Sequence, residues 1–435
     1  MTITSLETAP DRARESDAGI DLGRAEHLSD AALCEDAAAA IARPKEAPAD
    51  SFVLHAPLEL LARTALLPLV EPASRDRARA RLAWLRDTYA AAGRELTTTP
   101  ARRFDDAARA RDHLAGAIAD GDLDAADAAA HALATSCAPV ELVPLVADLV
   151  LPRLSAAGHG PIFLYQLRRV APRSRTVLGA FRGLARELAR SPDWELTWQR
   201  RVDDEPSARN ARGDDGRELA ERLRRPPSPG DPGSDFIFPT MSLVEQSGLA
   251  AELLAEPTRS LDAATASRVL ARVAACSMLQ DDPSHAPYGW THCLSMPQAV
   301  LGIADATSEA RAAVRIAATF ALGFRATQGR VTLDLDATPD STRTAKGTPA
   351  DFLTAAPTEA AAAAWSATGA SRREWITALA TRAAIHPDAH LAKYTLACFD
   401  AAAADPAAGR LHLAAAAFLS AWWAQLPSND DLLAS

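Results

Sequence analysis

The amino-acid sequence predicts an all-α protein, either a large multi-helix bundle or a solenoid-like stack of helices with long irregular loops. Two observations lead to this fold class. Alanine far outnumbers valine and isoleucine, and alanine is the strongest helix former. Apolar residues recur at helical spacing along most of the chain, and no segment shows the alternation of apolar and polar residues that marks a half-buried strand.

The helical pattern becomes clear at Ser51. Residues 51–70 carry leucines at helical spacing, as in FVLHAPLELL. Further helices, separated by short turns, are predicted at residues 76–95, 104–118, 123–136, 140–154, 242–256, 263–280, 294–304, 308–324, 357–367, 371–385, 388–404 and 409–425.

Two segments interrupt this rhythm. Residues 1–50 are acidic, rich in alanine and poor in large apolar groups, so we expect a flexible leader. Residues 191–240 contain RRPPSPGDPGSD and are expected to form a loop, a linker or a lid over a site. The remainder divides into an N-terminal helical half, residues 51–190, and a C-terminal half, residues 241–435, which together form one domain over residues 51–430.

Composition argues against several classes of partner. The net charge is -10 and no run of lysine or arginine is present, so a nucleic acid is not an expected partner. No apolar stretch approaches the roughly 20 residues of a membrane span, and no signal peptide is recognisable. The five cysteines form no CxxC pair and are odd in number, which favours a reduced compartment. We therefore expect a soluble, cytoplasmic protein; its oligomeric state is not predicted.

Histidines are the first candidates for a functional site. Four of the ten enter apolar helical segments: His55 in FVLHAPLELL, His159 in AAGHGPIFLYQL, His292 in YGWTHCLSMPQAVL and His390 in HPDAHLAKYTLACFD. A buried imidazole without a partner costs about 1–3 kcal/mol, so each needs a hydrogen bond or a metal. One such histidine is an ordinary core residue, but four in one chain favour a metal. The other settings are polar or rich in alanine, and we expect exposed or structural roles for His27, His113 and His131.

A lysine accompanies the last of these histidines. His390 and Lys393 are three residues apart in a helix that Asp388 begins, so both side chains lie on one face. Lysine is scarce, and the other two, Lys45 and Lys346, lie in polar loops. A buried lysine readily loses its proton, whereas arginine does not, so Lys393 is expected to act as a neutral amine. The alternative is a lysine that extends its charge to solvent.

The segment HLAKYTLACFDAAAADPAAGRLHLAAAAFL resembles the H-x-x-K-x-T-x-A helix and the following alanine-rich helix of the questin-oxidase-like family. The three other histidine contexts resemble the remaining signatures of that family in the same order, over residues 50–425. In that family, known from the tailoring of aromatic polyketides, four histidines and a carboxylated lysine bind iron, and dioxygen-dependent C–C cleavage opens a quinone ring. The resemblance implies five metal ligands: His55, His159, His292, His390 and Lys393.

The function implied is that of a non-haem, iron-dependent oxygenase acting on an aromatic polyketide or quinone-like metabolite, by C–C cleavage or Baeyer–Villiger-type oxygen insertion. Its cofactor would be Fe²⁺, although the same imidazoles accept zinc or nickel, and dioxygen would be the cosubstrate. His390 and Lys393 would be catalytic, with carbon dioxide converting the lysine into an anionic carbamate. No GxGxxG or Walker loop suggests an organic cofactor. Five aromatic residues near the proposed ligands either line a flat pocket for the small-molecule aromatic substrate or simply pack in the core: Phe163, Tyr165, Tyr288, Trp290 and Tyr394.

Two of the matches depart from the family pattern. A glycine separates His159 from its proline, and Cys293 follows His292 where a small residue is expected. Three further histidines are therefore alternative ligands: His285, His386 and His412.

Other interpretations of the same residues remain open. His386 and Asp388 form an H-x-D pair, as in sites with two histidines and one carboxylate, but they precede a helix and not a strand. Asp281 and Asp282 begin a partial DDxxD motif, or simply terminate a helix. The alternative from another class is a helical-repeat binding or scaffold protein, in which the histidines are incidental.

Overall fold

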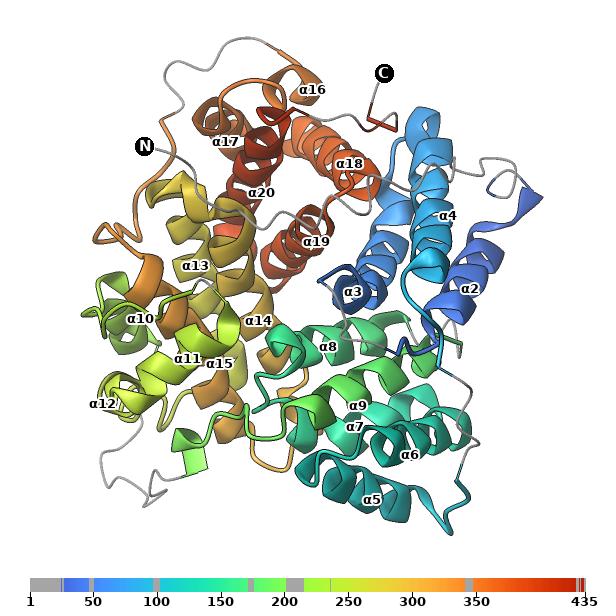
Figure 1. Cartoon of the computed structure of the whole chain (residues 1–435). Helices are drawn as coiled ribbons and strands as arrows, with labels where there is room; N and C mark the ends of the chain where they lie inside the picture. Colours follow the sequence, from blue (N-terminus) through green and yellow to red (C-terminus); the bar gives the residue numbers. More distant parts are fainter. Residues whose placement is uncertain are drawn as a thin grey trace.

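The computed structural model describes residues 25, 27–46, 51–96, 102–170, 176–200, 215–234, 236–340, 347–427, 430 and 432–433. Over these residues the chain forms 19 α-helices and no strand, which confirms the all-α prediction (Figure 1). Extended pairing in the described ranges is limited to two isolated bridges, Lys45 with Glu95 and Arg153 with Glu195.

The first helices of the chain are α2 (Asp30–Ile41), α3 (Ser51–Leu66), α4 (Arg75–Ala91), α5 (Ala107–Ala119), α6 (Leu123–Ser136), α7 (Pro139–Val150), α8 (Gly160–Val170), α9 (Phe181–Arg190) and α10 (Arg217–Arg224). The later ones are α11 (Ile237–Gln246), α12 (Leu249–Leu254), α13 (Ala263–Gln280), α14 (Thr291–Gly302), α15 (Ala310–Gln328), α16 (Pro349–Phe352), α17 (Pro357–Ser366), α18 (Gly369–Ile385), α19 (Ala389–Ala404) and α20 (Gly409–Ala424).

Aspartates set the starting points of several helices. Asp106, Asp122, Asp262 and Asp388 each accept a hydrogen bond from a first-turn N–H of the helix that follows. Such a cap contributes about 1 kcal/mol because it satisfies a donor that the helix leaves unpaired. These helices therefore begin where the sequence places an N-cap residue.

Segments distant in the sequence pair in the fold. Helix α3 packs against α19, and α8 packs against α14, so the N-terminal and C-terminal halves meet along these contacts (Figure 1). In a solenoid each repeat contacts only its neighbours. The pairing observed here is that of a closed multi-helix bundle, and it brings the ends of four helices to a common centre.

The prediction of a flexible leader over residues 1–50 is wrong for residues 30–41. Those residues form α2, which packs against α4 and buries Leu33, Ala37 and Ile41. These three residues lie four apart and so share one helix face. The face is hard to recognise in the sequence because alanine, which contributes little to an apolar pattern, makes up half of the helix. Residues 1–24 lie outside the described part of the chain.

The segment over residues 191–240 is also more ordered than the loop that was predicted. Its described part contains α10, whose Leu219 and Leu223 are buried. Its role as a lid stays a prediction, since residues 201–214 lie outside the described ranges.

A buried arginine ties the two site-bearing helices together. Arg63 in α3 pairs with Glu59 one turn earlier, with 2.7 Å between Nε and Oε1. Its guanidinium also donates to the carbonyls of Ala383, Ala384 and His386, at 2.9, 2.6 and 2.6 Å. These carbonyls end α18 and begin the turn into α19, so Arg63 sets the position of α3 relative to the first turn of α19.

The Asp281-Asp282 pair terminates a helix, as one of the two interpretations had it. Asp281 follows the last residue of α13, and its carboxylate accepts hydrogen bonds from the Arg325 guanidinium at 2.6 Å and the Arg330 N–H at 2.9 Å. The buried ion pair of Asp281 with Arg325 is therefore satisfied within the protein, and it stabilises the fold.

No helix in the described ranges combines the length and apolar character needed to cross a bilayer. All five cysteines are buried free thiols. They pack as small apolar residues, and the compartment stays a prediction.

Candidate metal centre

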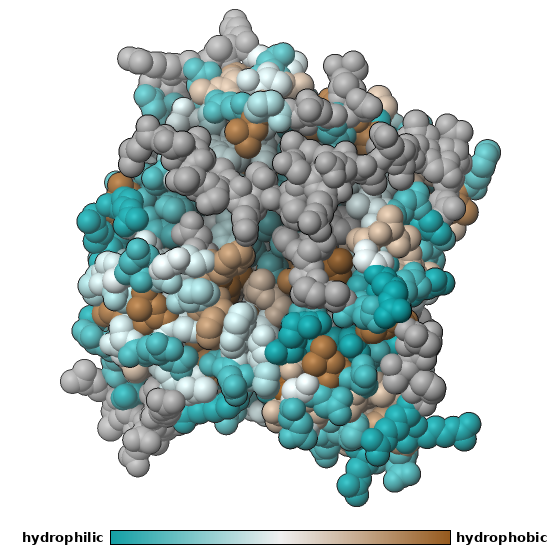
Figure 2. Space-filling view, in the orientation of Figure 1, coloured by the Kyte–Doolittle hydropathy of each residue, from teal (hydrophilic) through white to brown (hydrophobic). Residues whose placement is uncertain are grey.

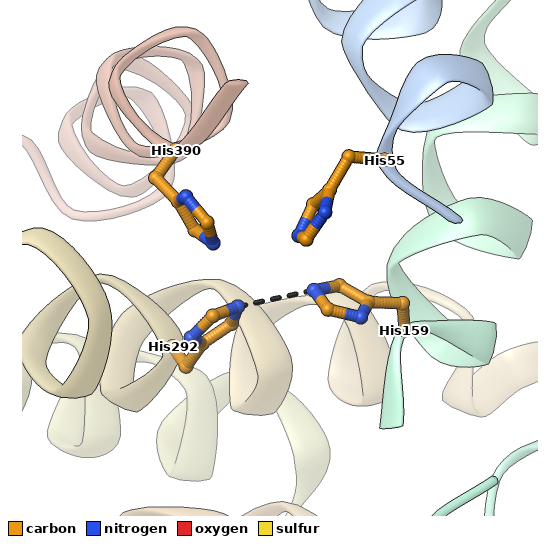
Figure 3. Close-up of side chains that lie close together, drawn as sticks. All are labelled: His55, His159, His292 and His390. Atoms are coloured by element: carbon orange, nitrogen blue, oxygen red, sulfur yellow. Dashed lines mark hydrogen bonds between the residues drawn. The ribbon is translucent and has the colours of Figure 1, made fainter. Parts of the chain in front are cut away.

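Four histidines from distant parts of the chain converge on one point (Figure 3). One ring nitrogen from each of His55, His159, His292 and His390 lies within 4.8 Å of the others. The rings form a closed circuit, with neighbouring centroids 4.7, 5.1, 5.0 and 4.8 Å apart. No other such group of histidine, cysteine or acidic side chains occurs in the part of the chain that the structure describes. The structure thus brings together the four histidines that the sequence singled out.

His159 is presented by a strained turn just before α8. Ala156 and Ala157 have φ of 53° and 50°, which L-residues rarely adopt, and Gly158 follows with φ of 65°. A Cβ on Gly158 would lie 2.9 Å from the Ile237 side chain, so only glycine fits there. Such strain concentrates at functional sites, where the surrounding structure holds it in place.

His292 and His390 lie in the first turns of their helices. A π-helical turn, Ala286–Trp290, precedes α14, and His292 is the second residue of α14. Single π-turns occur often at functional sites. His390 is the second residue of α19, whose N-cap is Asp388, and Lys393 follows one turn later.

Hydrogen bonds at Nδ1 orient three of the rings. His159 Nδ1 lies 3.1 Å from the Ala156 carbonyl, and His292 Nδ1 lies 2.8 Å from the Tyr288 carbonyl. His390 Nδ1 lies 3.2 Å from Asp388 Oδ1. Because carbonyl oxygens only accept, Nδ1 carries the proton in His159 and His292, and the Nε2 lone pairs of these rings are left facing the centre. Metal-binding histidines are oriented by such contacts.

The inward nitrogens of the rings are close together, and the nearest two do not donate to each other. His159 Nε2 and His292 Nε2 are 3.1 Å apart, the contact dashed in Figure 3, although both are acceptors in these tautomers. His390 Nε2 is buried and has no hydrogen-bond partner among the described residues. Acceptor lone pairs that face one another out of contact with water are unfavourable unless a donor or a cation lies among them.

Lys393 joins this cluster. Its Nζ lies 3.4 Å from His159 Nε2, and the residue is 3% exposed. Burial lowers the pKa of the amine to about 7, although the carboxylates of Asp388 and Glu59 oppose the shift. All five residues expected to act as ligands therefore lie together, and the alternative of a lysine that extends to solvent is wrong.

Burial also sets the charge state of the rings. Burial, followed by the nearby Lys393 amine, holds the pKa of His159 well below its usual value. Burial and His390 do the same for the pKa of His292. Burial lowers the pKa of His390, while Asp388 opposes the shift. These three rings are thus neutral near pH 7, which is the state in which imidazole binds metals.

The alternative histidines lie elsewhere. His386 accepts a hydrogen bond from the Asp388 N–H at 3.1 Å, and its ring faces Trp423, so the H-x-D pair does not form a shared site. His285 contacts Trp290, and His412 is buried within α20. None of these three joins the four-histidine group.

Lys45 lies outside the helices, as predicted, but it is buried and does not extend into solvent. It is 8% exposed, donates to the Ala90 carbonyl at 3.2 Å, and lies over the Tyr89 ring. Lys346 lies outside the described residues.

Of the five aromatic residues considered for a substrate pocket, one lies beside the rings of the histidine cluster. The ring of Tyr288 lies 4.5 Å from that of His292 and 5.9 Å from that of His390, and it is only partly buried. The others contact different groups or pack in the core: Phe163, Tyr165, Trp290 and Tyr394. Tyr288 is therefore the aromatic residue placed to contact a molecule at the cluster.

The cluster has a closed and an open side. His292 is fully buried and His159 is 3% exposed, whereas the His390 side chain is 14% exposed. In the orientation of Figure 1, where α3, α8, α14 and α19 approach a common centre, Figure 2 shows a hollow with apolar residues around it. His390 and Tyr288 are thus more exposed than His159 and His292.

Two orienting residues were missed from the sequence. Asp388 was recognised as a helix start, but its contact with the His390 ring was not foreseen. The spacing of two residues between an N-cap aspartate and a histidine is the sequence signal that could have predicted this contact. No sequence signal identifies the Tyr288 carbonyl as a partner of His292, because the π-helical turn creates that contact.

The fold and the site define an all-α protein with a buried cluster of four histidines and one lysine. No protein-family model, curated protein or solved structure matches the chain.

Proposed function

We propose that the protein is a non-haem, iron-dependent oxygenase of the questin-oxidase-like type, acting on an aromatic polyketide or quinone-like metabolite. The observation that carries the proposal is the set of imidazole nitrogens that face one another beside a buried lysine amine, His159 Nε2 and His292 Nε2 being 3.1 Å apart. A cation at their centre would turn an unfavourable arrangement of lone pairs into a favourable one.

The donor set fits such a metal. Neutral imidazoles bind iron, and also zinc and nickel, while an anionic oxygen favours a divalent ion further. The described structure supplies four rings with their inward nitrogens grouped, and it orients three of them through Nδ1. A centre of this kind, when it holds iron(II), supplies the electron that activates dioxygen.

Lys393 would supply the anionic oxygen. With a pKa of about 7, a large fraction of the amine is neutral at neutral pH. The Nζ lone pair attacks the carbon of carbon dioxide, an N–C bond forms, and one N–H proton is released to solvent. The product is a carbamate with one negative charge, which offsets the charge of a bound cation.

The residues on the open side would bind the substrate. The Tyr288 ring offers an aromatic surface beside His292 and His390, and aromatic rings stack on flat polycyclic molecules. A bound polycycle would cover His390 and exclude water from the cluster. An electron-rich phenolic substrate supplies its own reducing equivalents, so no organic cofactor is required.

Metal analysis combined with carbon-13 NMR tests this function. Protein purified after expression with added iron is expected to contain about one iron per chain, and incubation with ¹³C-bicarbonate is expected to give one carbamate resonance that disappears in Lys393→Ala. Anaerobic titration with anthraquinones should then show saturable binding. A protein that neither contains nor acquires iron would contradict the proposal and favour a helical-repeat scaffold.

Replacing Asp388 with asparagine is expected to weaken iron binding by about 10–100-fold, because the carboxylate that orients the His390 ring becomes neutral. Asparagine is also a good N-cap, so α19 should still form. Asp106→Asn, at the N-cap of α5, is the matched control and should leave iron affinity unchanged. Competition with a coloured chelator measures the affinity. Equal affinities in both variants would show that Asp388 only caps the helix.

A further inference from the structure

A small pocket lies behind the histidine cluster. Its walls come from the end of α2, from α3 and α4, and from α8 and α9, and its volume is about 50 Å³. His159 forms part of the wall, as do Leu54 and Pro57, the neighbours of His55 in α3. The His55 and His159 rings are 4.7 Å apart. The His159 ring therefore stands between the pocket and the centre of the cluster, with the His55 ring next to it.

The pocket is built for a neutral molecule. Most of its walls are apolar, including Val53, Phe163 and Leu184. Three charged residues also contribute to it: Lys45, Arg186 and Glu187.

Each of these charged residues already has a partner. Lys45 Nζ lies 4.9 Å from the centre of the Tyr89 ring and donates to a carbonyl. Arg186 pairs with Asp124 at 2.8 Å, and Glu187 pairs with Arg190 at 3.2 Å. Arg186 and Glu187 are thus neutralised by ion pairs, and the Lys45 amine is engaged by a carbonyl and an aromatic ring.

Its size excludes the proposed substrate. A water molecule needs on the order of 10–15 Å³ of such a volume, so about 50 Å³ holds a few waters or one or two diatomic molecules. A polycyclic aromatic molecule does not fit. Apolar walls favour an apolar gas over water, since a dry apolar cavity offers water no hydrogen bonds.

We infer that this pocket receives dioxygen and delivers it to the cluster past the rings of His55 and His159, an inference that rests on the proposed oxygenase function. The aromatic substrate takes the opposite side, where His390 is partly exposed and Tyr288 lies. With separate routes, dioxygen reaches the cluster while the substrate covers the open side and keeps water out.

Gly183 offers a means to close the pocket. It lines the pocket from within α9, and a Cβ built on it meets no atom within 4 Å. Gly183→Leu should therefore fill the space without a clash. Gly116, in the middle of α5 and not part of the pocket, also has open space around its Cβ, so Gly116→Leu is the matched control.

Two measurements test the inference on the full-length protein. Xenon binding, followed by ¹²⁹Xe NMR, reports on the pocket without any metal; we expect binding in the wild type and in Gly116→Leu, and its loss in Gly183→Leu. Nitric oxide, a diatomic probe that binds iron(II), reports on delivery; stopped-flow mixing of the anaerobic iron-loaded protein should show binding about tenfold slower in Gly183→Leu. The final EPR amplitude should be unchanged.

The outcomes separate the two proposals. Equal nitric oxide rates in Gly183→Leu and the wild type, or equal xenon binding, would overturn the dioxygen route while leaving the iron site in place. Failure of the wild type to bind iron would instead contradict the oxygenase function. Metal analysis determines the iron content before the xenon and nitric oxide measurements are made.

Discussion

Replacing Lys393 with alanine is expected to abolish tight iron binding and turnover while the helices remain intact. The amine lies 3.4 Å from His159 Nε2 and is the only source of an anionic ligand that the proposal gives the cluster. Loss of a ligand should cost more than the roughly 100-fold in affinity that loss of an orienting partner costs. His390→Ala should have the same effect. Chelator competition, iron analysis and circular dichroism measure affinity, occupancy and helix content.

Lys393→Arg sharpens this prediction. A guanidinium keeps its proton and does not form a carbamate, so this variant should also fail to bind iron although it retains a long side chain. Lys346→Arg, a lysine outside the described residues, is expected to behave as the wild type. Full activity in Lys393→Ala or Lys393→Arg would remove the mechanism proposed here, because both variants lack the reactive amine.

Replacing Arg63 with methionine is expected to lower the free energy of unfolding by about 3–5 kcal/mol, since a buried Glu59 is left without its partner. Three carbonyls at the end of α18 also lose a donor. The double variant Arg63→Met with Glu59→Leu should recover part of this loss, because it leaves no charge buried alone. Urea unfolding followed by circular dichroism measures the difference.

The chain offers a matched control for this pair. Arg222 and Glu218 form the same i,i+4 arrangement in α10, but their side chains are 46% and 48% exposed. Arg222→Met should therefore change the free energy of unfolding by less than about 0.5 kcal/mol. If both arginine variants lose the same amount, burial is not what makes the Arg63 pair important.

The candidate ligands were accessible from the sequence because their local contexts are unusual. His390 and Lys393 share a helix, and a helix fixes the relation of residues three apart without help from the rest of the fold. His55, His159 and His292 stood out because an imidazole in an apolar segment needs a partner. The sequence supplied these candidates but no distance between the helices that carry them.

The residues that orient the site were less accessible. Arg63 acts on carbonyls more than 300 positions later, and such pairing leaves no trace in a single sequence. Lys45 was assigned to a polar loop since its neighbours in sequence are polar, yet the fold places it over Tyr89. Helix α2 was missed because alanine makes up half of its residues and obscures its apolar face.

Local sequence alone was enough to establish the all-α class, the start of α19 at its aspartate cap, and the common face of His390 and Lys393, because helix geometry depends on neighbouring residues. Convergence of the four rings and the low pKa of the lysine came only from the packing of α3, α8, α14 and α19. Burial and close approach between distant segments arise from tertiary contacts, and no single helix could have brought these imidazole nitrogens within 4.8 Å of one another.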